Sequence, residues 1–148
     1  MRIYLDVCCL NRPFDDRRQD RVRLEAEAVL TILSRSHRER WTLMSSEVVD
    51  FEIAEIPDDG RRQRVSLLSS ASRSSVRVDE TTTKRAVELC ALGFQSVDAL
   101  HLACAEQGGA DVLLTTDDRL VQKASQNKAG LKVKVINPVR WLIEEIEQ

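Results

Sequence analysis

Five acidic residues stand at positions where a parallel α/β fold collects polar side chains. Asp6 directly follows an apolar segment at the start of the chain, and Asp117 and Asp118 follow the segment DVLLTT much later. Asp98 lies in the first turn of an expected helix, where the helix dipole favours negative charge, and Glu52 lies among apolar residues in a shorter helical segment. Because parallel strands present ligands beyond their carboxyl ends, we expect the acids after the two strands to meet in one crevice.

Carboxylates held together at one edge of a sheet repel each other, and a divalent cation offsets that cost. Mg²⁺ and Mn²⁺ prefer carboxylate oxygen atoms and keep several water ligands. Such an ion can activate water as a nucleophile and neutralise the charge that develops on a phosphodiester. Each acid taken alone also has a structural explanation, as a helix cap, a first-turn acid or a solvated side chain. Metal-dependent hydrolysis is therefore favoured by the set of four acids: Asp6, Glu52, Asp98 and Asp117.

Other catalytic arrangements find little support in the sequence. It contains no Gly-x-Ser-x-Gly segment, and no glycine-rich phosphate loop follows the first apolar segment, which argues against a nucleotide-binding Rossmann protein. Neither His37 nor His101 has an evident partner for nucleophilic catalysis. His101, one turn after Asp98, could orient a carboxylate or touch substrate, but a structural role on its helix is the favoured interpretation.

The composition is that of a globular domain rich in charge. The 148 residues are 43% hydrophobic and 31% charged, and the net charge of −2 gives no global attraction to nucleic acid. The 22 basic residues comprise 17 arginines and 5 lysines. This excess of arginine over lysine suits phosphate binding, but surface ion pairs explain it more simply. No signal sequence and no apolar run of ~20 residues is visible, so a cytoplasmic location and no membrane contact are expected. We interpret the four cysteines as buried apolar side chains: Cys8, Cys9, Cys90 and Cys104.

Short apolar segments alternate with helical patterns along the chain. Strands are expected at 3–7, 41–44, 76–78, 112–115 and 133–136. Helical segments are expected at 20–37, 47–56, 61–71, 81–93, 96–109, 117–130 and 137–147. Loops are expected at 11–16 and 56–60, and the serine-rich stretch 68–75 could be a helix end that continues into a loop. Asp20, Ser96 and Asn137 are the expected caps of three of these helices.

This alternation predicts βαβ units and hence a parallel sheet covered on both faces. The expected fold class is α/β, a three-layer α/β/α sandwich with a mainly parallel five-stranded sheet. No repeat, linker or low-complexity tract divides the chain, so residues 1–148 are expected to form a single domain.

Three segments of the chain, IYLDVCCL, SSEVVDFEI and SVDALHLACAEQGGADVLLTTDDRL, resemble the PIN domain family. That family includes the metal-dependent ribonucleases of VapC-type toxin–antitoxin pairs. The resemblance covers essentially the whole chain, and its most specific part runs from Asp98 to Leu120. It implies that one or two Mg²⁺ or Mn²⁺ ions are bound, directly or through water, by four acids: Asp6, Glu52, Asp98 and Asp117.

The resemblance also implies an endoribonuclease that cuts single-stranded RNA, a homodimer and an antitoxin partner. Many family members have a hydroxyl residue shortly after the first aspartate, where this chain has Val7 and Cys8, and Asn11 could supply an amide instead. Glu47 and Asp118 are secondary candidates on the two later acidic segments.

Three arginines follow the first acidic residue and are candidates for binding the RNA backbone: Arg12, Arg17 and Arg18. A solvated loop, in which they pair with nearby aspartates, is the simpler interpretation. Two other functions stay open at this point. One is a non-catalytic PIN-like module that binds RNA or protein, and the other is a flap nuclease or exonuclease that acts on DNA.

Overall fold

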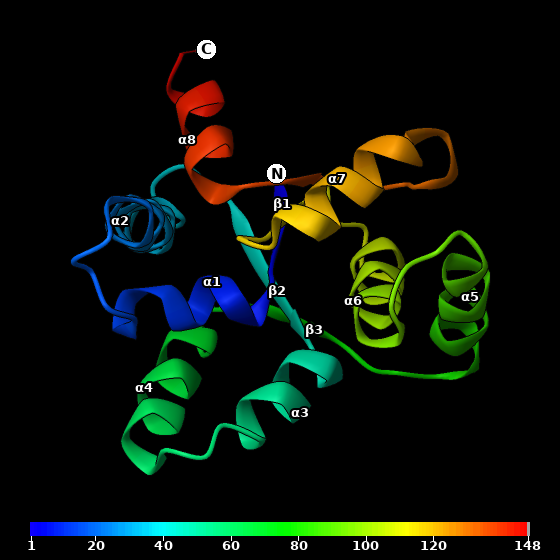
Figure 1. The fold of residues 1–148 in the computed structure, drawn as a ribbon, viewed down its shortest axis with the longest axis horizontal. Coiled ribbons are helices and arrows are strands. Elements are labelled where there is room, and N and C mark those ends of the chain that lie inside the picture. The colour runs from blue at the N-terminus through cyan, green and yellow to red at the C-terminus, as the bar shows by residue number, and fades with distance from the viewer. Residues whose placement is uncertain (148) are drawn as a thin grey trace.

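A five-stranded, all-parallel sheet lies between two layers of helices in the computed structural model, which describes residues 1–147 (Figure 1). The strands are β1 (Arg2–Leu5), β2 (Thr42–Ser46), β3 (Ser74–Val76), β4 (Val112–Leu114) and β5 (Lys134–Ile136). The α-helices are α1 (Val7–Asn11), α2 (Asp20–Arg35), α3 (Glu47–Ala54), α4 (Asp59–Ser69), α5 (Glu80–Ala91), α6 (Ser96–Gln107), α7 (Asp118–Gln126) and α8 (Pro138–Ile146), and two 3₁₀ turns are η1 (Arg12–Phe14) and η2 (Lys128–Gly130). This architecture confirms the predicted fold class.

The strand order β3-β2-β1-β4-β5 changes direction between β1 and β4. The chain first moves from β1 to the β3 edge and then returns to β4 and β5. Helices α1, α2, α4 and α8 lie on one side of the sheet, and α5, α6 and α7 lie on the other (Figure 1). Such a reversal opens a crevice at the carboxyl ends of the two central strands. The backbone N–H of Asp6 donates to the Leu114 carbonyl at 3.0 Å, which ties these two ends together.

The central strands are buried on both faces, as continuous apolar segments of a parallel sheet should be. Ile3, Tyr4 and Leu5 are at most 3% exposed, and the three residues of β4 are buried as well. The edge strands β3 and β5 each include exposed or half-buried residues. The rigid middle of the sheet therefore carries the residues that follow β1 and β4.

The glycine pair after α6 lets this helix lie close to the sheet. A Cβ atom on Gly108 would stand 2.2 Å from Cε of Met44 and 2.8 Å from Cγ2 of Val76, so only glycine fits without a shift. Gly109 has a φ of 73°, in the left-handed region that favours glycine. This close approach packs the end of α6 against β2 and β3.

Several predicted boundaries are wrong for local reasons. β1 ends at Leu5, because the Asp6 side chain accepts from the N–H of Val7 and starts α1 within the expected strand. The loop expected at 11–16 is partly helical and includes η1. β3 begins two residues before the expected strand, since its pairing with β2 includes Ser74 and Ser75, which have low strand propensity.

The helix caps were predicted with mixed success. Asn137 caps α8 and Pro138 is its first residue, as expected. Asp20 and Ser96 are instead the first residues of α2 and α6, whose N-cap positions hold glutamines without a capping hydrogen bond. Over the described part of the chain, no helix has both the length and the apolar character needed to cross a bilayer.

The prediction that all four cysteines are buried is wrong for two of them. Cys9 and Cys104 are buried, Cys8 is half-buried and Cys90 is exposed. Leu89 faces the core from α5, and the next residue of a helix is turned about 100° away from it. Cys90 therefore faces water.

Candidate metal centre

Asp6 is the most constrained acid of the crevice. Its Oδ1 accepts from the N–H of Val7 at 2.8 Å, and its Oδ2 accepts from Oγ1 of Thr115 at 2.8 Å and from Sγ of Cys8 at 3.3 Å. Thr115 directly follows β4, so the neighbouring strand supplies the hydroxyl that the residues after Asp6 lack. Only 9% of Asp6 is exposed, and these bonds fix the direction of its carboxylate.

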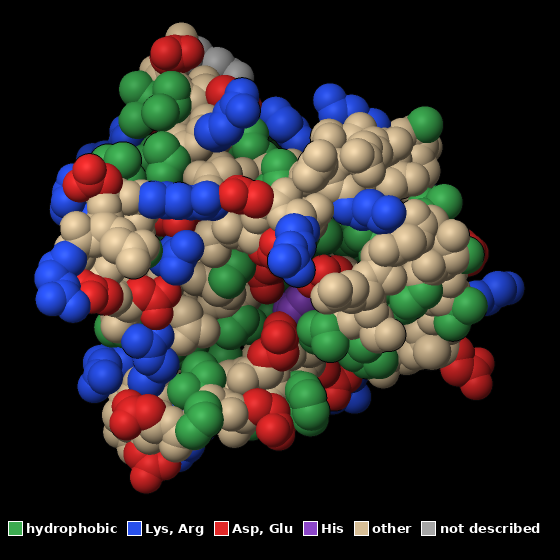
Figure 2. Space-filling model, in the orientation of Figure 1, with side chains coloured by type: hydrophobic (Ala, Val, Ile, Leu, Met, Phe, Trp, Pro, Cys, Tyr) green, Lys and Arg blue, Asp and Glu red, His purple; other side chains and the backbone are tan. Residues whose placement is uncertain are grey.

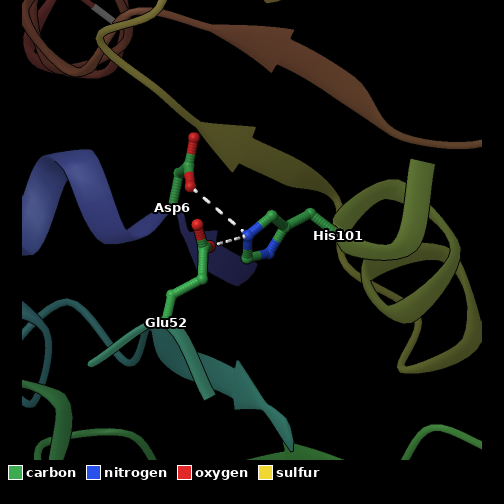
Figure 3. Close-up of side chains that lie close together, drawn as sticks. All are labelled: Asp6, Glu52 and His101. Carbon is green, nitrogen blue, oxygen red and sulfur yellow. Dashed lines mark hydrogen bonds and ion pairs between the residues drawn. The ribbon is translucent and has the colours of Figure 1, made fainter. Parts of the chain in front are cut away.

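Glu52 and His101 reach the same point from α3 and α6 (Figure 3). Nε2 of His101 donates to Oε1 of Glu52 and lies 3.7 Å from Oδ1 of Asp6. One possible ligand atom from each of the three residues lies within 4.8 Å of the other two. Figure 2 shows this part of the surface as a hollow in which histidine atoms lie among acidic and basic side chains.

The Tyr4 hydroxyl contacts the inner nitrogen of the His101 ring, and Ser46 contacts that hydroxyl in turn. Nδ1 lies 2.7 Å from Oη of Tyr4, and Oη of Tyr4 lies 2.6 Å from Oγ of Ser46. Burial raises the pKa of Tyr4 well above its usual value, so its hydroxyl keeps its proton. Burial by itself would lower the pKa of His101, but the bond to Glu52 and the charge of Asp6 raise it overall.

Asp98 and Asp117 border a neighbouring hollow of about 190 Å³, which Arg119 and Lys123 also line. Burial, followed by the charges of Asp6 and Asp117, raises the pKa of Asp98 to about 6. Asp117 is exposed and caps α7, with its Oδ1 accepting from the N–H of Arg119 at 3.0 Å. We refer to Asp6, Glu52, Asp98 and Asp117 as the acidic centre.

The three secondary candidates have other partners. The Asn11 side chain donates to a backbone carbonyl of its own helix, α1. Oε1 of Glu47 accepts from the N–H of Val78 at 2.8 Å, so this carboxylate supports the loop after β3. The Asp118 carboxylate forms two hydrogen bonds of 2.7 Å with Arg21. Glu52, rather than Glu47, is the α3 acid that meets Asp6.

The three candidate RNA-binding arginines also form bonds within the chain. Nε of Arg12 donates to Oε1 of Glu25 at 2.8 Å. The Arg17 guanidinium donates to a backbone carbonyl of η1. Arg18 pairs with Asp16, but its side chain is 90% exposed. Arg12 and Arg17 would have to give up these bonds to contact a ligand fully.

The donor set of the centre fits a divalent cation. Two carboxylates and one imidazole converge. Burial raises the pKa of the neighbouring Asp98, and the nearby charges of Asp6 and Asp117 raise it further. The sequence interpretation gave His101 a mainly structural role and did not include Thr115 or Tyr4. One signal was available: Tyr4 and Asp6 are two residues apart, so strand alternation directs both toward the face that α6 covers.

Comparisons with known proteins identify the family and support the fold. The family model for the PIN domain matches residues 3–126. One similar structure is a chain in the crystal structure of VapBC2 from Rickettsia felis bound to a DNA fragment from their promoter, with a TM-score of 0.55 and 13% identity over 93% of this chain and 98% of that one. Another is PAE2754 from Pyrobaculum aerophilum, with a TM-score of 0.56 and 18% identity over 100% of this chain and 91% of that one.

At these identities the two structures support the fold alone. No curated protein matches the sequence. The family model, in contrast, spans most of the chain and includes every residue of the acidic centre. The chain therefore belongs to the PIN domain family.

Proposed function

We propose that the protein is a metal-dependent endoribonuclease that hydrolyses phosphodiester bonds in single-stranded RNA. The observation that carries the proposal is the convergence of Asp6, Glu52 and His101 beside Asp98 at the crevice of the sheet. Membership of a family made up generally of nucleases supports the same reaction.

Each side chain of the centre has a role in this proposal. Asp6, oriented by Thr115, and Glu52, oriented by His101, would hold the ion. Asp98 from α6 and Asp117 at the N-cap of α7 would complete its surroundings, directly or through water. A divalent ion bound there supplies an activated water and neutralises charge on the phosphodiester.

The RNA backbone would lie over the start of α7. Arg119 and Lys123 line the same hollow as Asp98 and Asp117, and neither forms an ion pair within residues 1–147. Their charges are thus free to balance a phosphate next to the bond that is cut. We prefer these two residues to Arg12 and Arg17 as backbone contacts. Arg18, which is exposed, stays a weaker candidate.

We further propose that the chain is the toxin of a toxin–antitoxin pair, with a protein antitoxin and a homodimeric state. The likeness of its fold to a chain of VapBC2 supports the antitoxin partner. The homodimeric state rests on the family resemblance alone. A non-catalytic module with the same fold would bind RNA or protein without cutting.

The decisive experiment is cleavage of a labelled pool of single-stranded RNAs with Mn²⁺ or Mg²⁺, with DNA substrates measured in parallel. Asp6→Asn should lower RNA cleavage at least ~100-fold, because the most constrained ligand is lost. The control is Asp20→Asn, since Asp20 is an aspartate of α2 whose side chain is 83% exposed. Equal inactivity of the wild type and Asp6→Asn across the pool, with both ions, would leave the binding module as the better reading. Preference for DNA would favour the flap or exonuclease class.

A further inference from the structure

A buried imidazole at an otherwise acidic centre calls for a chemical explanation. Only 1% of His101 is exposed, yet its outer nitrogen faces the two carboxylates that would hold the ion (Figure 3). Nε2 contacts Glu52 directly and lies 3.7 Å from Oδ1 of Asp6. The three candidate ligand atoms lie within 4.8 Å of one another, a spacing that one ion could bridge.

The other side of the ring can supply the proton arrangement that a metal ligand needs. Oη of Tyr4 lies between Nδ1 of His101 and Oγ of Ser46, and either hydroxyl can donate to the other. When the Tyr4 hydroxyl turns toward Ser46, its oxygen accepts from Nδ1–H. Nε2 then presents a lone pair to the carboxylates. The change between these tautomers is balanced, since Nδ1 gains one proton and Nε2 loses one.

Histidines that bind metals generally donate their second N–H to a fixed acceptor, which orients the ring. The hydroxyl oxygen of Tyr4 can be this acceptor, and it is fixed because the Tyr4 side chain on β1 is fully buried. Ser46 is fixed as well, since its Oγ accepts from the N–H of Val49 at the start of α3. Strand β1, strand β2 and helix α6 thus hold the imidazole in a single direction.

We propose that Nε2 of His101 is a direct ligand at this centre and that it selects a first-row transition ion such as Mn²⁺ or Co²⁺ over Mg²⁺. Imidazole nitrogen suits transition ions, whereas Mg²⁺ prefers oxygen ligands only. This inference rests on the proposed metal-dependent function and narrows the identity of its ion.

A different role for His101 predicts different behaviour. If the imidazole only positions Glu52, the proton stays on Nε2 and the ion has an all-oxygen environment. Removal of the ring would then weaken Mg²⁺ and Mn²⁺ binding to the same extent. A direct nitrogen ligand would instead be visible in the spectrum of bound Mn²⁺ and would affect the two ions unequally.

The first test is pulsed electron paramagnetic resonance of Mn²⁺ bound to the full chain without RNA. We expect ¹⁴N coupling from a directly bound imidazole in the wild type. The coupling should remain in His37→Gln, which alters the other histidine of the chain, an exposed residue. It should disappear in His101→Gln. Absence of nitrogen coupling in the wild type, its persistence in His101→Gln, or failure of Mn²⁺ to bind would each overturn the inference.

The second test compares ion affinities by titration calorimetry. His101→Gln should weaken Mn²⁺ binding about thirtyfold and Mg²⁺ binding less than about threefold. Parallel losses for the two ions would assign His101 a positioning role only and reject the ligand role. The wild-type spectrum decides the question even if this variant folds poorly.

Neither measurement contains RNA, so the two proposals can fail separately. Nitrogen-bound Mn²⁺ in a protein that cuts no RNA would reject the nuclease proposal and keep this inference. RNA cleavage by a protein whose Mn²⁺ shows no nitrogen coupling would do the reverse.

Discussion

Two charged clusters lie beside the loop that follows β4, and the chain neutralises the carboxylate charge of only one of them. Glu25, 1% exposed on α2, accepts from Arg12 at 2.8 Å, from Arg21 at 3.1 Å and from Asn137 at 2.6 Å. We call these four residues the Glu25 cluster. The acidic centre gathers four carboxylates and meets a single imidazole, His101, with no arginine or lysine paired to it in residues 1–147.

The difference separates a group of charges that is balanced within the chain from one that we propose binds a metal ion. A buried charge is stable when the protein supplies its partners, as in the Glu25 cluster. The acidic centre keeps its excess negative charge, which favours a cation from outside the chain. The two are also connected, because Arg21 donates to the Thr116 carbonyl at 3.1 Å and pairs with Asp118 next to Asp117. The Glu25 cluster, whose charges are balanced, thus supports one side of the acidic centre, whose charges are not.

The largest effect is expected on breaking the Glu25 cluster. Glu25→Gln should lower the free energy of unfolding by about 3 kcal/mol or more, since two guanidinium groups lose their shared carboxylate. Urea unfolding measures the change, with Glu27→Gln as control, because Glu27 is an exposed glutamate of the same helix. A cost below about 1 kcal/mol would mean that water replaces the lost charge and that the cluster contributes little.

The next effect is the response of the acidic centre to a cation. Mn²⁺ at one hundred times its Kd should stabilise the wild type by about 2.7 kcal/mol, roughly 5 to 10 °C in Tm. Thermal unfolding of Asp6→Asn should show little of this gain, whereas Asp118→Asn should keep it because Asp118 is bound to Arg21. An equal Tm rise in Asp6→Asn would place the ion elsewhere.

A smaller effect concerns the pH dependence of the metal-free protein. The pKa of Asp98 is about 6 in the folded chain against an ordinary 3.8, so the folded state binds more protons between these values and stability falls as pH rises through this window. Above pH 6, Asp98→Asn should therefore be more stable than the wild type by about 1 to 2 kcal/mol, allowing for its partial exposure. The advantage should vanish below about pH 4. Urea unfolding at pH 4 and pH 7.5 tests this, and a gain that is the same at both values would contradict it.

The smallest effect compares two arginines in RNA binding. Arg119→Ala should weaken binding of single-stranded RNA to the Asp6→Asn background about fivefold at low salt, since one phosphate contact is lost. Arg18→Ala should change it less than about twofold, because Arg18 already pairs with Asp16. Fluorescence anisotropy over a series of salt concentrations gives both values. If Arg18→Ala weakened binding more than Arg119→Ala, the RNA backbone would instead lie on the loop between η1 and α2, which contains Arg18.

Much of the fold followed from local pattern in the sequence. Each of the five expected strands overlaps a strand of the structure, although the third shares only Val76 with β3. The agreement is good for β1 and β4, because buried parallel strands need continuous apolar residues. The errors lie where neighbours decide the outcome: Ser74 and Ser75 join β3 only because β2 pairs with them. Asp6 leaves the strand because its side chain starts α1.

The candidate site was predictable in part. The positions of Asp6 and Asp117 after two strands, and of Asp98 at a helix start, follow from topology, and their role as metal ligands stays a prediction. The family resemblance already favoured Glu52 over Glu47, and in the structure Glu52 is the one of these two α3 residues that contacts His101. The contact between His101 and Glu52 itself required the structure, because it depends on how closely α6 approaches the sheet at Gly108.

The sequence by itself determined the alternation of strands and helices and placed acidic residues at strand ends, since both properties depend on short-range pattern. Only the tertiary structure decided which charges are balanced. Glu25 meets Asn137, and Tyr4 meets His101, across long stretches of chain that no local periodicity relates. The physical reason is that electrostatic compensation depends on distance in space, so folding alone separates the satisfied Glu25 cluster from the acidic centre.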